Sequence, residues 1–235
     1  MKIGVFCYNF EHWKSREGLL NLFLSNKKPD VVFAANKVKL NFYQSKIRVA
    51  LKDLFLQHPN AICEKLNIPY YVIDHGGDEI VKLIKDYDLD IGIILGARIL
   101  KKTVIDAFNI GILNMHPGIL PTNRGLDNMK WAIYNNLPMG VTAHLIDEKI
   151  DRGLAVKRET IDIYEDDSLV DLHSRLQNLE QKLMLEALDI LMSPNLEPLV
   201  LHEGTYFKAM PEAEESKLAA KLRSYKKNSL PKYRL

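Results

Sequence analysis

An amide, an imidazole and a carboxylate stand in two short polar runs of this chain. Asn114 and His116 lie in the run Asn-Met-His-Pro, and Asp151 ends the run Asp-Glu-Lys-Ile-Asp. An amine that attacks a carbonyl carbon must lose a proton, which a histidine can accept. The carbonyl oxygen becomes negative, and an asparagine NH₂ can stabilise that charge. A carboxylate can orient the imidazole or a water molecule. Together the three side chains provide the groups needed to move an acyl unit onto an amine.

Each of these residues also has a purely structural interpretation. A histidine before a proline is often a loop residue, and an aspartate before Arg-Gly favours a turn. Three further histidines are also interpreted as structural residues: His75 in a loop, His144 in a strand and His173 on a helix. The catalytic hypothesis therefore depends on elements that bring Asn114, His116 and Asp151 together.

The first half of the chain alternates between short apolar runs and helical patterns. The apolar runs predict strands at 2–8, 30–35, 70–73, 90–96 and 111–115. Helical patterns lie near 45–57, 60–66, 78–86 and 101–107. This alternation predicts an α/β fold, with a Rossmann-like, mostly parallel sheet and helices on both faces. Active sites of such sheets lie at the carboxyl ends of strands, where Asn114 and His116 are expected.

The pattern changes after residue 120. A helix is predicted over 124–136, followed by a period-two strand over 141–146 and a partner strand over 154–163. These two strands are expected to be antiparallel, so that the turn between them returns Asp151 toward His116. A Leu-rich helix over 168–192 is expected to face the core, with a homodimer contact as the alternative. A shorter helix is expected near 211–224. We assign a catalytic domain to 1–192 and a C-terminal extension to 193–235.

Composition and net charge limit the kinds of partner that the chain is expected to bind. The chain has 235 residues, 47% hydrophobic content and a net charge of +2. These values suit one domain with a sizeable core and give no electrostatic argument for binding nucleic acid. The two cysteines lack the spacing of a zinc site, so no metal is expected. No signal peptide is recognised, and no apolar run has the roughly 18 residues of a membrane helix. We therefore expect a cytoplasmic protein with small-molecule substrates and no membrane partner.

Residues 96–153 resemble the folate-dependent formyltransferases. The resemblance rests on the runs 96–100, 114–121, 124–125, 140–144 and 147–153, which agree in order, spacing and residue type. It implies the formyltransferase fold and transfer of the formyl group of N10-formyltetrahydrofolate to a primary amine. It also implies catalytic roles for Asn114, His116 and Asp151, with His116 acting either as a base or, as imidazolium, on the oxyanion. The pterin pocket would be lined by Arg98, Ile99, Leu100, Asp147 and Ile150.

The amine expected to accept the formyl group depends on the branch of the family. The chain has no Gly-rich phosphate loop after its first strand, unlike glycinamide ribonucleotide formyltransferases, and no room for the C-terminal barrel of methionyl-tRNA formyltransferases. It resembles the nucleotide-sugar N-formyltransferases, in the short form that acts on dTDP-4-amino-4,6-dideoxyglucose for lipopolysaccharide O-antigen. The C-terminal extension would then complete the sugar site. Five residues are expected to bind this substrate: Tyr8, Asn9, Trp13, Arg124 and Tyr206. The alternatives are a formyltetrahydrofolate hydrolase, a glycinamide ribonucleotide-type enzyme and a non-catalytic binding module.

Overall fold

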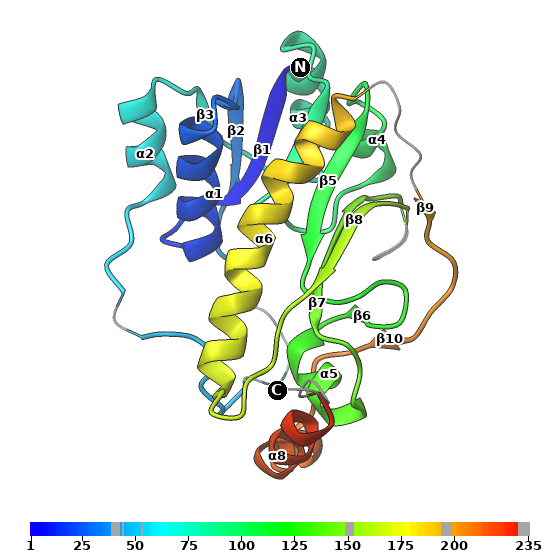
Figure 1. Ribbon diagram of the computed structural model, residues 1–235. Coiled ribbons are helices and arrows are strands. Elements are labelled where there is room, and N and C mark those ends of the chain that lie inside the picture. Colours follow the sequence, from blue (N-terminus) through cyan, green and yellow to red (C-terminus); the bar gives the residue numbers. More distant parts are fainter. Residues whose placement is uncertain (39–42, 44, 53, 149–152, 194–198, 230–235) are drawn as a thin grey trace.

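The fold is built on one eight-stranded sheet. The computed structural model describes residues 1–38, 43, 45–52, 54–148, 153–193 and 199–229 (Figure 1). The strand order is β3-β2-β1-β4-β5-β7-β8-β9. The first five strands in this order are parallel, and β7, β8 and β9 continue the sheet in antiparallel fashion. The predicted α/β class and mostly parallel sheet are therefore confirmed.

The strands of this sheet are short. Their bounds are Ile3–Tyr8 (β1), Val31–Ala35 (β2), Tyr70–Val72 (β3), Ile91–Ile94 (β4), Gly111–His116 (β5), Gly140–Leu145 (β7), Leu154–Thr160 (β8) and Leu199–Val200 (β9). A separate two-stranded sheet pairs β6 (Arg124–Gly125) with β10 (Tyr206–Phe207). The strand predicted over 111–115 extends one residue further, so that His116 belongs to β5 itself.

Helices cover both faces of the sheet. Their bounds are Trp13–Leu24 (α1), Pro59–Leu66 (α2), Asp78–Asp86 (α3), Lys102–Ile105 (α4), Asn128–Asn135 (α5), Leu169–Leu191 (α6), Glu212–Glu215 (α7) and Leu218–Ser229 (α8). In Figure 1, α1 and α6 lie in front of the sheet, and α3 and α4 lie behind it. None of these helices combines the length and apolar composition that a bilayer crossing requires.

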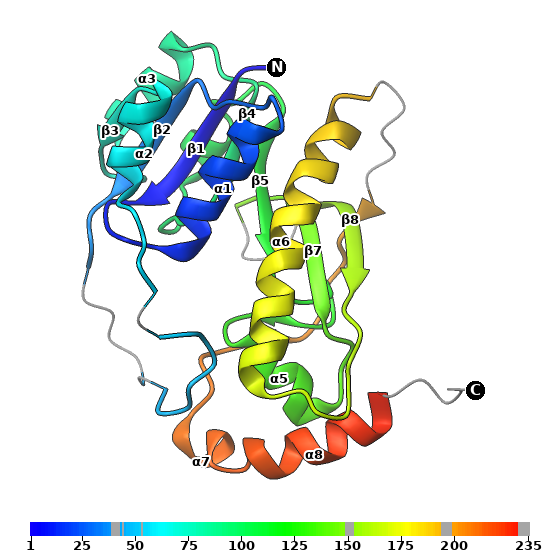
Figure 2. The ribbon, with the colours of Figure 1, turned by 60° about the vertical axis from the view of Figure 1, so that its left-hand side comes forward.

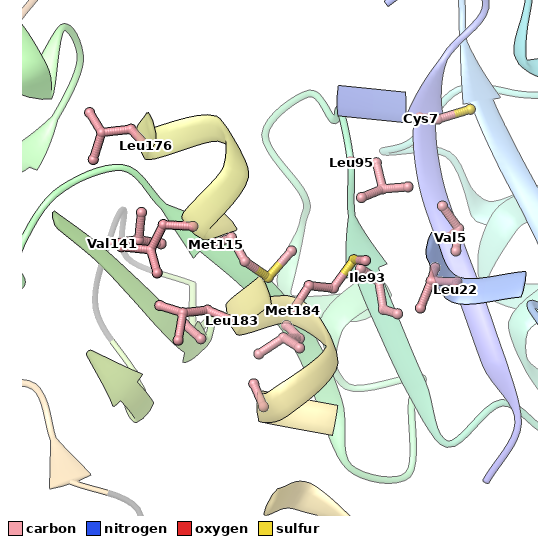
Figure 3. Packing of buried hydrophobic residues seen from close by; sticks show 14 of the residues in the cluster. Val5, Cys7, Leu22, Ile93, Leu95, Met115, Val141, Leu176, Leu183 and Met184 are labelled. Atoms are coloured by element: carbon pink, nitrogen blue, oxygen red, sulfur yellow. The ribbon is translucent and has the colours of Figure 1, made fainter. Parts of the chain in front are cut away.

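The alternation of side chains along β1 divides the core into two layers. Val5 and Cys7 belong to the larger cluster, together with residues of α1, α2 and α6. Phe6 points the other way, into a smaller cluster with residues of α3 and α4. Figure 3 shows the larger layer, where Leu183 and Met184 of α6 lie beside Met115 of β5. This packing fixes α6 across the strand that carries Asn114 and His116.

One helix of the structure was not predicted, and one predicted helix does not form in the described residues. The sequence pattern did not predict α1, because its start is polar and Gly18 lies inside it. Gly18 is needed there, since an added Cβ would lie 2.4 Å from a methyl carbon of Leu95. The helix predicted over 45–57 does not form in the described residues of that range. The backbone N–H of Lys46 instead donates to the carboxylate of Glu215, 3.0 Å away.

The predicted helix over 124–136 starts later than expected. Arg124 and Gly125 form β6, and Asp127 adopts a left-handed conformation (φ 52°) before α5 begins. The Asp127 carboxylate does not cap this helix and accepts instead from the backbone N–H of Met210, 2.8 Å away. The C-terminal helix predicted over 211–224 is divided into α7 and α8. Figure 2 shows the segment that contains α7 and α8 lying beside α5.

Candidate functional site

Two strands place the candidate catalytic side chains at the carboxyl end of the parallel part of the sheet. β5 and β7 are antiparallel, with Asn114 opposite His144 and His116 opposite Thr142. Because side chains alternate along a strand, Asn114, His116 and His144 share one face of the sheet. Met115 points to the other face, where it is buried under α6. The register of two strands therefore creates a cluster of one amide and two imidazoles.

His144 orients the amide of Asn114. The amide nitrogen of Asn114 lies 3.2 Å from Nε2 of His144, so the amide donates and the ring nitrogen accepts. His144 is fully buried, which keeps this contact away from water. An asparagine NH₂ has two N–H groups, so one remains for another acceptor. This second N–H is the donor that an acyl oxygen would need.

His116 is held by the backbone of the loop that follows it. Its Nε2 lies 2.8 Å from the carbonyl oxygen of Asn123, and the ring is 3% exposed. Because a carbonyl can only accept, the proton is on Nε2, and the neutral ring carries its lone pair on Nδ1. The rings of His116 and His144 meet edge to face, with centroids 6.3 Å apart. The orientation of the His116 ring is therefore fixed by the backbone at residue 123.

Buried polar contacts fix the loop over residues 117–123. The side-chain amides of Asn123 and Asn128 each donate to the other residue's backbone carbonyl, at 2.9 and 3.0 Å. The Thr142 hydroxyl donates to the carbonyl of Gly118 at 2.8 Å and accepts from the N–H of Leu120 at 3.0 Å. The carbonyl that holds His116 thus belongs to a rigid segment.

A cavity of about 300 Å³ lies beside Pro117, next to His116. We call it the histidine pocket; its lining includes His12, Lys14, Lys130, His173, Gln177 and Glu180. Lys14 Nζ donates to the carbonyl of Met115 at 3.1 Å and to a carboxylate oxygen of Glu180 at 3.3 Å. Burial raises the pKa of Glu180, while Lys14 and, whenever its ring is protonated, His116 act in the opposite direction. A buried carboxylate therefore lies within electrostatic range of His116.

The charges in the histidine pocket balance. Lys14 pairs with Glu180, and Lys130 Nζ lies 3.3 Å from Asp127 and 2.8 Å from Glu215. Burial, followed by the neighbouring Lys14, lowers the pKa of His12 to about 4. Burial also lowers the pKa of His173. Both imidazoles are therefore neutral at pH 7, and the described lining offers no unpaired cation to a phosphate.

Glu215 ties the C-terminal extension to this pocket. Its carboxylate accepts from Lys130 Nζ, from the hydroxyl of Tyr43 at 2.9 Å, from the hydroxyl of Ser45 at 2.5 Å and from the N–H of Lys46 at 3.0 Å. The segment that starts there continues to Val49, which lines the histidine pocket. Figure 2 shows this segment reaching down to α7. The extension thus contacts both α5 and the loop at the pocket wall.

Three predicted binding residues gather at the ends of β1, β2 and β4, where the ring of Tyr8 lies 5.1 Å from the ring of His12 of the histidine pocket. The guanidinium of Arg98 lies over the ring of Tyr8, 5.0 Å from its centroid, and donates to the carbonyl of Asn36 at 3.2 Å. The side chain of Asn9 donates to Asn36 at 2.8 Å and accepts from the hydroxyl of Tyr70 at 2.9 Å. These contacts occupy polar groups of Arg98 and Asn9 within the protein.

The other predicted residues fall in different places. Ile99 is 81% exposed, whereas Leu100 is buried in the smaller core cluster. Arg124 and Tyr206 are paired across β6 and β10, with Arg124 buried and Tyr206 44% exposed. Trp13 opens α1 and lines a second hollow. Asp147 is exposed at the end of the described part of its loop. Asp151 and Ile150 lie outside the described residues.

Sequence reasoning did not identify several residues of the site. His144 alternates along a strand, and only the register with β5 shows which face it takes. Lys14 and Glu180 are far apart in sequence, on α1 and α6, and meet only through packing of both helices on the same face. The one sequence signal for Glu180 is a carboxylate on the apolar side of a Leu-rich helix. Among the described residues, no group of three His, Cys, Asp or Glu side chains is placed to hold a metal ion.

Comparison with known proteins identifies a family for this chain. A family model described as "Formyl transferase" matches residues 28–188. A methionyl-tRNA formyltransferase of Flavobacterium psychrophilum is 34% identical over 114 residues, which are 48% of this chain but only 36% of that relative.

Solved structures share the fold at lower identity. An N-formyltransferase of Helicobacter canadensis, in complex with folinic acid and dTDP-3-aminofucose, superimposes with a TM-score of 0.63 at 19% identity, over 99% of this chain and 84% of that one. A phosphoribosylglycinamide formyltransferase of Streptococcus pneumoniae gives a TM-score of 0.62 at 19% identity, over 82% and 99% of the two chains.

Proposed function

The chain belongs to the formyl transferase family, and from this premise we propose that it transfers the formyl group of N10-formyltetrahydrofolate to the amine of a nucleotide-linked 4-amino-4,6-dideoxy sugar. The observation that supports this acceptor is the charge-balanced histidine pocket, which is lined by Pro117, the residue that follows His116 in the chain. The pocket provides hydrogen-bonding groups and a buried carboxylate around a cavity of about 300 Å³. These features suit a neutral sugar ring that carries one amine.

Asn114 and His116 divide the chemistry between them. When the acceptor nitrogen attacks the formyl carbon, a C–N bond forms and the π electron pair of the C=O bond moves onto oxygen. Asn114 donates its second amide N–H to this oxyanion, because His144 holds the first. Such a donor is worth most where it is fixed before the reaction. His144 acts as a positioning residue, since it touches the amide.

His116 accepts the proton that the attacking nitrogen loses. Its Nε2–H is bonded to the Asn123 carbonyl, so Nδ1 carries the lone pair in the neutral ring. The bond from carbon to N10 of the folate then breaks, its electron pair stays on N10, and N10 takes up a proton. The products are the sugar formamide and tetrahydrofolate. Asp151, outside the described residues, is proposed to raise the basicity of His116 and to orient a water.

Glu180 is proposed to bind the amine of the acceptor. Its carboxylate lines the histidine pocket and is 6% exposed. A carboxylate close to the reacting nitrogen can accept a hydrogen bond from it and favour the approach of the amine. Lys14 balances the charge of Glu180 before the acceptor binds. The formyl donor is proposed to use the backbone of residues 98–100 and the loop that begins at Asp147.

The same pocket argues against the phosphate-bearing acceptor of a glycinamide ribonucleotide enzyme. Cationic side chains form the strongest hydrogen bonds to a phosphate monoester. Here Lys14 and Lys130 are engaged by carboxylates, and His12 and His173 are neutral at pH 7. Glycinamide ribonucleotide is therefore a weaker candidate than an amino sugar whose phosphates lie outside the histidine pocket.

The test is a panel of acceptors with N10-formyltetrahydrofolate as the donor. The panel contains dTDP-4-amino-4,6-dideoxyglucose, its UDP and GDP counterparts, glycinamide ribonucleotide and methionyl-tRNA, with products analysed by mass spectrometry. We expect one nucleotide sugar to gain the mass of CO, and His116→Ala to abolish this gain. Formylation of glycinamide ribonucleotide or methionyl-tRNA alone would contradict the proposal. Formate release without any amine would identify a hydrolase instead.

A further inference from the structure

A second hollow, of about 440 Å³, adjoins the histidine pocket. Trp13 forms one wall, Leu51 and Leu54 of the loop before α2 form another, and Gln177 and Asn178 of α6 complete it. We call it the tryptophan hollow. Its lining is mostly apolar, with a few polar groups at one side, which is the usual composition of a small-molecule site.

The two cavities share part of their lining. Gln177 lines both of them. Trp13 stands in the chain between His12 and Lys14, which line the histidine pocket. One ligand can therefore place one part beside His116 and another part against Trp13. A ligand made of a sugar joined to a nucleotide has this two-part form.

The tryptophan hollow leaves apolar side chains exposed in the protein alone. Leu51 is 57% exposed and Leu54 is 45% exposed, although both are large apolar residues. The side chain of Asn178 is exposed at the edge of the hollow, and that of Gln177 is half-buried there. An exposed apolar surface with amides at its edge suits a flat ring that carries its own donors and acceptors.

We infer that the tryptophan hollow binds the base of the nucleotide-linked acceptor, an inference that rests on the proposed function. The base stacks on the indole of Trp13, and Leu51 and Leu54 cover its far side. The carboxamides of Gln177 and Asn178 pair with the edge of the base, because a carboxamide offers one donor and one acceptor side by side. This arrangement leaves the sugar amine free to reach the histidine pocket.

Binding of a nucleotide without an amine tests this site separately from catalysis. Isothermal titration with dTDP, UDP and GDP is performed on the wild-type chain, Trp13→Ala and the control Phe23→Ala. Phe23 is an aromatic residue of the same helix that lines neither cavity. We expect at least one nucleotide to bind, and Trp13→Ala to raise its Kd about 5- to 100-fold, the range for loss of one stacking side chain. Phe23→Ala should leave the Kd unchanged.

Kinetics provide a second readout. Trp13→Ala should lower kcat/KM for the nucleotide-linked sugar by the same factor and leave it unchanged for the amino sugar 1-phosphate, which has no base. Asn178→Leu, which keeps the branched shape and removes the amide, should give a smaller loss on the nucleotide-linked substrate only.

Three results would overturn the inference. The first is a Kd for every nucleotide that is the same in Trp13→Ala and wild type. The second is an equal loss on both acceptors, which would indicate a merely structural role for Trp13. The third is a dimer, seen by light scattering, that Trp13→Ala converts to a monomer, which would identify a second copy as the occupant. If nucleotides bind as expected but no amino sugar is formylated, the proposed function fails and the base site stands.

Discussion

Replacement of Glu215 by glutamine tests the link between the C-terminal extension and the histidine pocket. Glu215 is 2% exposed and accepts hydrogen bonds from Lys130, Ser45, Tyr43 and the backbone of Lys46. Glutamine keeps the shape but removes the charge, which leaves the buried ammonium of Lys130 with Asp127 alone. We expect a less stable protein and a weaker wall at the acceptor site.

The size of the effect follows from the pKa of Glu215. Burial by itself would raise this pKa, but the hydrogen bonds from Lys130, Ser45, Lys46 and Tyr43 outweigh burial and lower it from 4.5 to about 2. At about 1.4 kcal/mol per pKa unit, the ionised carboxylate contributes about 3 kcal/mol to the free energy of unfolding at pH 7. This agrees with the roughly 3–5 kcal/mol lost when one partner of a buried ion pair is removed.

The sign of the pH dependence follows from the lowered pKa. The contribution is present above the unfolded pKa of about 4.5 and disappears as the pH falls through about 2. The stability difference between wild type and Glu215→Gln should therefore shrink from about 3 kcal/mol at pH 7 to roughly half of that at pH 3. Urea unfolding at both pH values measures it. KM for the acceptor should also rise, because the loop that reaches Val49 loses its attachment.

Glu212→Gln is the matched control. Glu212 lies on the same helix, is exposed and pairs with the exposed Lys46. Exposed ion pairs contribute about 0–1 kcal/mol, so this variant should unfold like the wild type. Two results would show that the charge of Glu215 does not stabilise the protein in this way. One is a Glu215→Gln protein as stable as the Glu212→Gln protein, and the other is a stability difference that is the same at pH 3 and pH 7.

Three further predictions concern the reacting groups. Asn114→Ala should lower kcat about 10²-fold, as expected for loss of one oxyanion donor; near-normal turnover would remove Asn114 from that role. His144→Leu should lower kcat about 10-fold or more through misplacement of the amide, and the double variant should be no slower than Asn114→Ala alone, whereas additive losses would show that His144 acts elsewhere. Glu180→Gln should raise KM for the acceptor in steady-state kinetics and leave KM for the formyl donor unchanged; an equal rise in both would exclude amine binding as its role.

The parts of the fold that could be predicted are those that local sequence determines. Apolar runs identified the five parallel strands, and the position of Asn114 and His116 at a strand end follows from sequence adjacency alone. The start of the long helix is also determined locally, because Ser168 and Asp171 form a capping box there. Predictions from such local patterns are correct here because the tertiary contacts favour the same elements.

The parts that could not be predicted depend on contacts between distant segments. Helix α1 contains Gly18, which looks unfavourable until Leu95 is seen to need the space. The segment before α2 has a helical pattern, but Glu215, more than 160 residues later, takes its backbone and hydroxyl donors. The roles of His144 and Glu180 likewise require the β5–β7 register and the packing of α6. Asp151 remains a prediction of the sequence.

The most direct test of formyl transfer to a nucleotide-linked amino sugar is the reaction itself. Wild type and Asn114→Ala are each mixed with N10-formyltetrahydrofolate and dTDP-4-amino-4,6-dideoxyglucose, and tetrahydrofolate and the sugar product are followed together. We expect one formylated sugar for each tetrahydrofolate released by the wild type, and a rate about 10²-fold lower for Asn114→Ala. Tetrahydrofolate release without a formylated sugar, or equal rates for the two proteins, would contradict this expectation.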